Sequence, residues 1–175
     1  MGFCHRYSFG NNAIIPDESM NILMFTYEVV DEGGNFIRCF SLAKNLVKLG
    51  HRVTVLASNK TQGFIERKTI RQGVDVIEIA CPLPHRFRHN GMSPFQIIHR
   101  AVHVLSNRYD VVHGFGHRPS VFIPAFIHKL LYRRPYVADW ADLWGWGGLA
   151  SYRGGTWGTI VGWLDDVWKN LYTVS

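Results

Sequence analysis

The sequence predicts an α/β protein with a Rossmann-like parallel sheet and helices on both faces. Short apolar segments alternate along the chain with longer segments whose apolar residues recur at helical spacing. Short apolar runs are typical of strands that are buried on both faces, and regular alternation of strand and helix favours parallel pairing. Glycine and proline lie between these segments, where the chain is expected to turn.

The first predicted unit is a strand over 22–26, a helix over 36–49 and a second strand over 52–57. Apolar residues recur at helical spacing in the helix, and Gly50 follows it as a C-terminal stop. A strand, a helix and a second strand in this order make a βαβ unit, whose crossover is expected to be right-handed.

The later elements repeat this alternation. Ser93 followed by Pro94 is typical of a helix start, an N-cap before a first-turn proline. The remaining predicted elements are a strand over 74–80, a helix from 94 to about 107, a strand over 110–113, a helix over 119–132, a strand over 135–140, a loop rich in glycine and tryptophan over 143–156, a helix over 157–170 and a strand over 172–174.

Domain limits follow from the same pattern. Residues 1–19 show no period and are predicted to be a loosely ordered leader, so the predicted domain covers 20–175. Because the sequence stops in or just after a predicted strand, we expect the domain to be truncated at its C-terminal end.

Composition excludes several classes of protein. Hydrophobic residues make up 47% of the chain, which excludes intrinsic disorder, and 19 Lys and Arg against 13 Asp and Glu give a net charge of +6. No apolar run reaches the length of a membrane span, and the N-terminus lacks the apolar core of a signal peptide. The three cysteines are too far apart for a disulfide framework or a zinc site, so a cytoplasmic protein is expected.

The loop after the first predicted strand carries the first candidate site residues. Ligands of open parallel sheets bind beyond the carboxyl ends of the strands. Gly33, Gly34 and Asn35 lie there, just before a helix, where backbone N–H groups can approach a phosphate or a sugar hydroxyl. The loop is neither a P-loop nor a GxGxxG sequence, and a plain tight turn is the alternative.

The later strands end near further candidates. His113 and His117 lie at and after the end of the fourth predicted strand, where an imidazole could act as acid or base or bind a hydroxyl. Asp139 and Asp142 follow the fifth, where a carboxylate could orient a hydroxyl, act as a base or merely cap the next turn. With Trp144 as a platform, Asp139 and His117 are expected to bind substrate. No third metal ligand is apparent, so no metal is expected.

Basic residues and further histidines are open to several interpretations. His99 and His103 lie four apart in a predicted helix and are expected to be solvated rather than ligands. A basic patch favours phosphorylated substrates or, with Phe87 and Phe95, an anionic membrane surface. No nucleic-acid motif accompanies it, and a merely solvated face is the alternative. The patch consists of His85, Arg86, Arg88, His89, Arg100, Lys129, Arg133 and Arg134.

Four stretches resemble the N-terminal domain of family 4 glycosyltransferases. They are EGGNFIRCFSLAKNLVKLGHRVTVLAS (32–58), YDVVHGFGH (109–117), RPYVADWADLWG (134–145) and WLDDVWKNLYTVS (163–175). The resemblance covers 20–175 and implies one half of a GT-B fold, in which two Rossmann-like domains face a cleft. It implies a metal-independent and usually retaining enzyme, whose N-terminal domain holds the acceptor. A C-terminal domain, missing from this sequence, would bind the nucleotide sugar through paired Glu residues.

The resemblance also implies roles for single residues. The glycines of 33–35 match a loop that touches the donor diphosphate or the acceptor. Many members of the family place a His after the fifth strand, near the reacting centre, whereas this sequence has Ala141 or Asp142 there. Asp142 therefore becomes the expected catalytic residue, with His113 in support, and a simple His-base mechanism is not expected.

The expected function is the acceptor-binding half of a glycosyltransferase of polysaccharide or glycolipid synthesis. The expected partners are a nucleotide sugar and a glycan or glycolipid acceptor, at the inner face of the membrane, with no cofactor and no nucleic acid. Without the donor half, the isolated chain is expected to be inactive. The alternatives are a non-catalytic subunit that docks a separate donor-binding chain, or another GT-B or Rossmann-like enzyme such as an epimerase. A nucleotide-binding reductase is disfavoured by the lack of GxGxxG.

Overall fold

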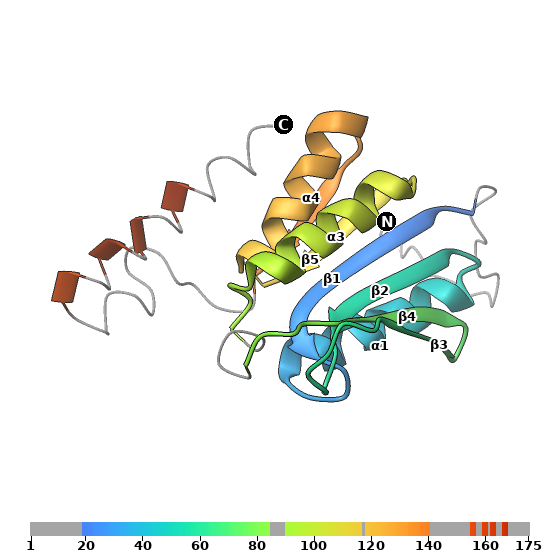
Figure 1. The fold of residues 1–175 in the computed structure, drawn as a ribbon. Helices are drawn as coiled ribbons and strands as arrows, with labels where there is room; N and C mark the ends of the chain where they lie inside the picture. The colour runs from blue at the N-terminus through green and yellow to red at the C-terminus, as the bar shows by residue number, and fades with distance from the viewer. Residues whose placement is uncertain are drawn as a thin grey trace, which may run out of the picture.

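The structure of the 175-residue chain is a computed structural model. The described residues are 19–84, 90–116, 118–140 and the short pieces 155–156, 159–160, 162–163 and 166–167. Across 19–140, with the gaps in these ranges, the described chain forms one six-stranded sheet and three α-helices (Figure 1).

The sheet has the strand order β3-β4-β2-β1-β5-β6, which confirms the predicted Rossmann-like α/β fold. All neighbouring strands pair in parallel except β3 and β4, which form an antiparallel hairpin. The strands are β1 (Asn21–Val29), β2 (Arg52–Ser58), β3 (Arg67–Arg71), β4 (Val74–Ile79), β5 (Val111–Phe115) and β6 (Tyr136–Asp139).

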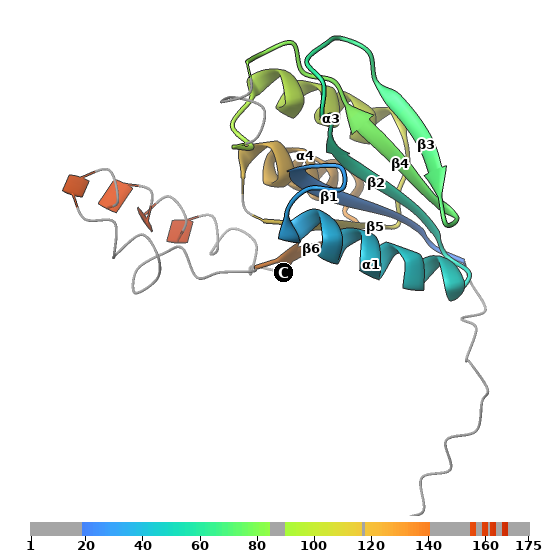
Figure 2. The same cartoon turned by 90° about the horizontal axis from the view of Figure 1, so that it is seen from below.

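Helices cover both faces of the sheet. Helix α1 (Gly34–Lys48) lies on one face, and α3 (Pro94–Ser106) and α4 (Pro119–Tyr132) lie side by side on the other (Figure 2). Ser93 caps α3 as the sequence predicted, because its hydroxyl accepts a hydrogen bond from the backbone N–H of Gln96 at 3.4 Å.

Two apolar clusters hold these layers together. Because side chains alternate along a strand, β1, β2, β4 and β5 contribute to both faces. On the face covered by α1, Phe36 and Cys39 of the helix cluster with Met24, Val55 and Phe115 of the strands. On the opposite face, Val104 of α3 and Val121 of α4 cluster with Phe25, Leu56 and Ile79 of the strands.

Strand β3 corrects the prediction of a wholly parallel sheet. It is an edge strand with exposed Arg67, Lys68 and Ile70, so it lacks the apolar run by which the inner strands are recognised. A tight turn at Gln72 and Gly73, both with positive φ, reverses the chain into β4.

Other predictions meet the limits of the described residues. The leader over 1–18 lies outside them, and so do the loop, helix and strand expected after 140, apart from the short helical pieces. Among the helices that the structure describes, none has the length and apolar character that crossing a membrane requires.

Candidate functional site

The carboxyl ends of β1, β5 and β6 meet the first turns of α1 and α4 at one side of the sheet. We call this region the carboxyl edge, because ligands of such sheets bind beyond these strand ends. It consists of Tyr27, Glu28, Gly33, Gly34, Asn35, Arg38, Gly116, Arg118 and Asp139.

Glu28 caps the N-terminus of α1. Its Oε2 accepts a hydrogen bond from the backbone N–H of Phe36 at 2.9 Å, and its Oε1 accepts one from Asn35 Nδ2 at 3.0 Å. The residue at the N-cap position, Gly33, has no side chain for this purpose. A carboxylate is favourable at the positive end of a helix, so Glu28 fixes the loop that leads into α1.

The two glycines of this loop serve different needs. Gly33 has φ 80° and ψ 153°, a conformation that other residues rarely adopt, and a Cβ there would lie 2.3 Å from Glu28 Oε2. Gly34 has no such constraint, since a Cβ there would meet nothing within 4 Å. The backbone N–H groups of Gly34 and Asn35 bond to no group in the described ranges of the chain. They remain able to bind a ligand oxygen.

Tyr27 stands at the centre of the carboxyl edge. Its hydroxyl accepts a hydrogen bond from Asn35 Nδ2 at 3.4 Å, and the guanidinium carbon of Arg118 lies 5.8 Å from its ring centroid. Gly116, with φ 87°, packs against the ring so closely that a Cβ would lie 2.8 Å from Cε1. The ends of β1 and β5 and the start of α4 therefore meet on this ring.

Asp139 is held in an ion pair with Arg38. Its carboxylate forms an ion pair with Arg38 of α1, whose guanidinium also lies 5.9 Å from the ring centroid of Phe115. The ion pair occupies one of its two oxygens and ties the end of β6 to α1. Asp139 thus lies at the edge, as the sequence predicted, with its carboxylate already paired.

His113 does not lie at a strand end. Strand β5 continues to Phe115, so His113 is central in the strand and stacks on Phe115 with ring centroids 4.3 Å apart. Burial lowers the pKa of His113; nearby Asp139 opposes this effect and Arg38 adds to it. The imidazole is therefore neutral at neutral pH and stands behind the Arg38–Asp139 pair.

A fully buried arginine lies beneath the carboxyl edge. Arg100 Nη2 donates to the carbonyl oxygen of Thr26 at 2.8 Å, and Nη1 donates to that of Ser120 at 3.1 Å. Nη2 also lies 3.4 Å from Ser58 Oγ, whose hydroxyl donates to the carbonyl oxygen of Tyr27 at 2.8 Å. Arg100 thereby fastens the ends of β1 and β2 to the start of α4.

The burial of Arg100 corrects its predicted place in a surface patch. No carboxylate of the described chain pairs with it, and burial lowers its pKa to about 9, which leaves the guanidinium charged at neutral pH. The buried charge is stabilised at its two Nη atoms, which donate to two carbonyl oxygens and the Ser58 hydroxyl.

The structure brings together only part of the predicted site. Gly33, Gly34, Asn35 and Asp139 meet at the carboxyl edge, and His113 lies beside it on the α1 face. His117, Asp142 and Trp144 lie outside the described residues. Within the described ranges, no three His, Cys, Asp or Glu side chains are arranged to hold a metal ion.

Several edge residues were missed by sequence reasoning. Glu28 lies near the end of β1 and Arg118 follows β5, both at the carboxyl side, where the rule for open sheets directs attention. Their position at the carboxyl side was therefore the signal that could have identified them. Arg38 and Tyr27 gave none, because their importance depends on partners far away in the sequence.

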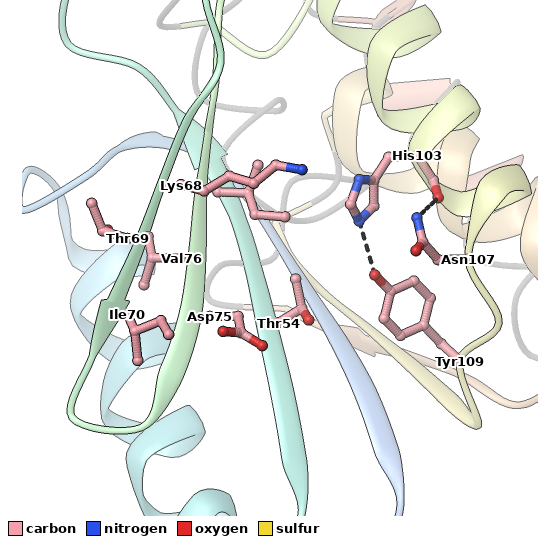
Figure 3. Close-up of a pocket in the computed structure, with 10 residues that line it drawn as sticks. Thr54, Lys68, Thr69, Ile70, Asp75, Val76, His103, Asn107 and Tyr109 are labelled. Carbon is pink, nitrogen blue, oxygen red and sulfur yellow. Dashed lines mark hydrogen bonds between the residues drawn. The ribbon is translucent and has the colours of Figure 1, made fainter.

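Away from the carboxyl edge, a hollow that we call the hairpin groove lies between the β3–β4 hairpin and α3 (Figure 3). It has a volume of about 450 Å³, and a lobe of about 270 Å³ adjoins it through shared residues. We define the groove by Thr54, Lys68, Ile70, Asp75, Ile77, His103, Asn107 and Tyr109.

The histidines of α3 lie along this groove rather than in open solvent, contrary to the prediction. His103 Nε2 is 2.8 Å from the hydroxyl of Tyr109, and His99 Nε2 is 3.3 Å from Glu66 Oε2. Burial is the largest influence on the pKa of His103 and lowers it.

Comparison with known proteins points to one family. The model of a family described as a glycosyl transferase 4-like domain matches residues 34–171. No curated protein matches the chain. Among solved structures, the C-terminal domain of a hydrogenase from Pyrococcus furiosus is similar, with 18% identity and a TM-score of 0.47. That match covers 71% of this chain and 94% of the hydrogenase domain, and it carries no information on activity.

Proposed function

The chain belongs to the glycosyl transferase 4-like domain family, and we propose that it is the acceptor-binding half of a glycosyltransferase. In this proposal a sugar passes from a nucleotide sugar to a glycan or glycolipid acceptor, without a metal and with retention of the anomeric configuration. The family match supports sugar transfer in general, and the carboxyl edge supports the assignment of parts below.

The observation that carries the proposal is the free start of α1. The N–H groups of Gly34 and Asn35 have no partner among the described residues, and the space above Gly34 is open. Helix N-termini favour oxygen ligands that carry negative charge or lone pairs. The loop over 33–35 can therefore bind a hydroxyl of the acceptor or a phosphate oxygen of the donor.

The remaining edge residues take complementary roles in the proposal. Arg118 adds positive charge beside Tyr27, where an anionic group of either substrate would pass. Because Asp139 is paired with Arg38, we assign the reacting centre to Asp142 and a substrate-orienting role to Asp139. His117 and Trp144 are assigned to substrate binding.

We assign His113 a positioning role. Its neutral ring stacks on Phe115. Both Asp139 and Arg38 act on its pKa, so the ring lies close to the ion pair. Replacement of His113 by Gln should alter turnover through the Arg38–Asp139 pair and shift the pH profile.

The test places a side chain in the open space above Gly34. Gly34→Leu should leave folding intact, because nothing lies within 4 Å of its Cβ, and should lower sugar transfer at least about tenfold by covering the free N–H groups. The assay is incorporation of labelled sugar from UDP- and GDP-sugars into polysaccharide and lipid fractions of cells that carry only the variant. Asp142→Asn should abolish incorporation. Full transfer by Gly34→Leu would refute the assignment of the loop.

We also propose that the protein works at an anionic membrane surface, on the cytoplasmic side. The outer face of α3 and α4 presents exposed aliphatic side chains, with Ile98 64%, Val102 52%, Leu105 47%, and Leu130 and Leu131 each 61% exposed. Neither helix contains Asp or Glu, and Arg133 and Arg134 follow α4. Apolar side chains framed by cations favour the headgroup region of anionic bilayers.

Vesicle flotation tests this surface. The double variant Val102→Glu, Leu130→Glu should lose binding to phosphatidylglycerol-containing vesicles that the wild type binds. Ile37→Glu is the matched control, since Ile37 is 59% exposed on α1 at the opposite face. Equal flotation of all three proteins, or none by the wild type, would contradict the proposal.

A further inference from the structure

We propose that the hairpin groove is a second saccharide-binding subsite, which holds a neutral part of the acceptor glycan away from the carboxyl edge. The inference rests on the proposed function for the nature of the ligand. It uses none of the edge residues, so the two proposals can fail separately.

The groove is a hollow with two walls (Figure 3). Lys68, Ile70 and Asp75 of the hairpin face His103 of α3 and Tyr109 across it. Its volume of about 450 Å³ is in the range of small-molecule sites, and the lobe of about 270 Å³ extends it along α3. The two hollows share Lys68, His103 and Asn107, so an elongated ligand can occupy both.

Uncharged polar groups form one side of the groove. The hydroxyl of Tyr109 contacts His103 Nε2 at 2.8 Å, and Asn107 presents an amide. Burial raises the pKa of Tyr109 to about 12 and lowers that of His103, so both are neutral at neutral pH. Hydroxyl, imidazole and amide groups both donate and accept hydrogen bonds, as sugar hydroxyls do.

The hairpin side adds an apolar wall. Ile70 is 77% exposed, and its aliphatic surface can contact the C–H face of a pyranose ring.

Charge selects against anionic ligands. One ammonium, that of Lys68, and two carboxylates, those of Asp75 and Glu66, line the groove and its lobe, and Lys68 Nζ pairs with Glu66 Oε1 at 3.1 Å. Asp75 forms no ion pair with any described residue and remains an acceptor for ligand hydroxyls. A phosphate would meet net negative charge here, whereas a neutral polyhydroxylated ligand would not.

The position of the groove suits a chain that also reaches the carboxyl edge. Thr54 in the groove lies opposite Leu23 of β1, four residues before Tyr27. At about 3.3 Å per strand residue, the groove is roughly 13 Å from the edge along the strand direction. A glycan of a few units can span this distance, and contact at two places raises its effective affinity.

Binding by NMR tests the proposal directly. The isotope-labelled chain is titrated with neutral tetrasaccharides of glucose, galactose, mannose or N-acetylglucosamine. At least one should shift the amide signals of Lys68, His103 and Asn107. Tyr109→Phe and Asp75→Asn should each weaken that binding roughly five- to tenfold, the loss expected for one hydrogen bond. Lys68→Ala, at an exposed position, gives a third variant that does not threaten folding.

Two controls separate the proposals. Tyr132→Phe removes the same hydroxyl from a tyrosine outside the groove, one that donates to the carbonyl oxygen of Leu105 at 3.0 Å, and should leave saccharide binding unchanged. Gly34→Leu should lower transfer and should still show the saccharide-induced shifts of Lys68, His103 and Asn107, because the groove residues are unchanged; only the added affinity from contact with the loop over 33–35 should be lost. If no tetrasaccharide shifts the groove signals, or if all three groove variants bind like the wild type, the subsite proposal is wrong whatever happens at the edge. If the groove binds but Gly34→Leu transfers normally, the assignment of the loop is wrong and the subsite stands.

Discussion

Substitution of Gly33 by alanine tests whether the start of α1 depends on the backbone conformation of Gly33 and on the Glu28 cap. The backbone at Gly33 has φ 80° and ψ 153°, which costs a residue with a side chain about 1–3 kcal/mol. The new Cβ would lie 2.3 Å from Glu28 Oε2, so the carboxylate must leave its bond to the N–H of Phe36. Loss of a hydrogen bond to a charged group costs about 1.5–3 kcal/mol.

These terms combine to a substantial loss of stability. Alanine restricts the unfolded chain and returns about 0.4–1 kcal/mol, so Gly33→Ala should lower the free energy of unfolding by about 2–5 kcal/mol. At about 2–4 °C per kcal/mol for a chain of this size, Tm should fall by roughly 4–20 °C. Urea unfolding followed by circular dichroism measures the first quantity, and a thermal scan measures the second.

Gly34→Ala is the matched control. It makes the same chemical change one residue later, where a Cβ meets nothing within 4 Å, and it should leave stability unchanged or raise it by up to about 1 kcal/mol. In a Glu28→Ala background the clash is absent, so Gly33→Ala should cost about 1.5 kcal/mol less than in the wild type. A difference between the two glycine variants below about 1 kcal/mol would refute this account of the loop.

Three further predictions concern packing and protonation. Arg100→Met should lower the free energy of unfolding in urea by about 2–4 kcal/mol, because two buried carbonyl oxygens lose the donor that Arg100 provides. A loss under about 1 kcal/mol would contradict the role of Arg100 as a clamp between β1 and α4. Gly116→Ala should cost about 1–3 kcal/mol and shift the NMR signals of the Tyr27 ring, since its φ is 87° and its Cβ would lie 2.8 Å from that ring; an unchanged Tm would contradict this prediction. His103 and His113 titrate in the fold below the usual 6.5, so the unfolded chain binds more protons and stability should fall as pH drops below about 6.5; a urea midpoint equal at pH 7.5 and 5.5 would contradict this.

Most of the fold was predictable because its inner elements carry periodic apolar patterns. Strand β2 is buried from Val53 to Ser58, and α1 buries residues at helical spacing, so local sequence reported tertiary position. Strand β3 was missed because its side chains are mostly charged and exposed, so it shows no apolar run. Its pairing with β4 depends on the turn at Gly73.

The site was less predictable than the fold, since its geometry depends on contacts across the chain. Arg100 was expected at the surface because arginine is seldom buried. Yet Gln96, Arg100 and Val104, at intervals of four, are all buried, and this spacing was a readable sign that they share one helix face. His113 was misplaced by two residues at the end of a strand, which is the usual weakness of strand boundaries.

The clamp formed by Arg100 has a consequence for how the molecule opens. One side chain holds the end of β1 and the start of α4, and through Ser58 it also holds the end of β2. Proteins open locally in cooperative units, and we expect segments that are fastened to one buried group to open together. Around Thr26, Ser58 and Ser120 the backbone should therefore share one protection factor in hydrogen exchange. A ligand that slows exchange at one of these segments should slow it at the other two.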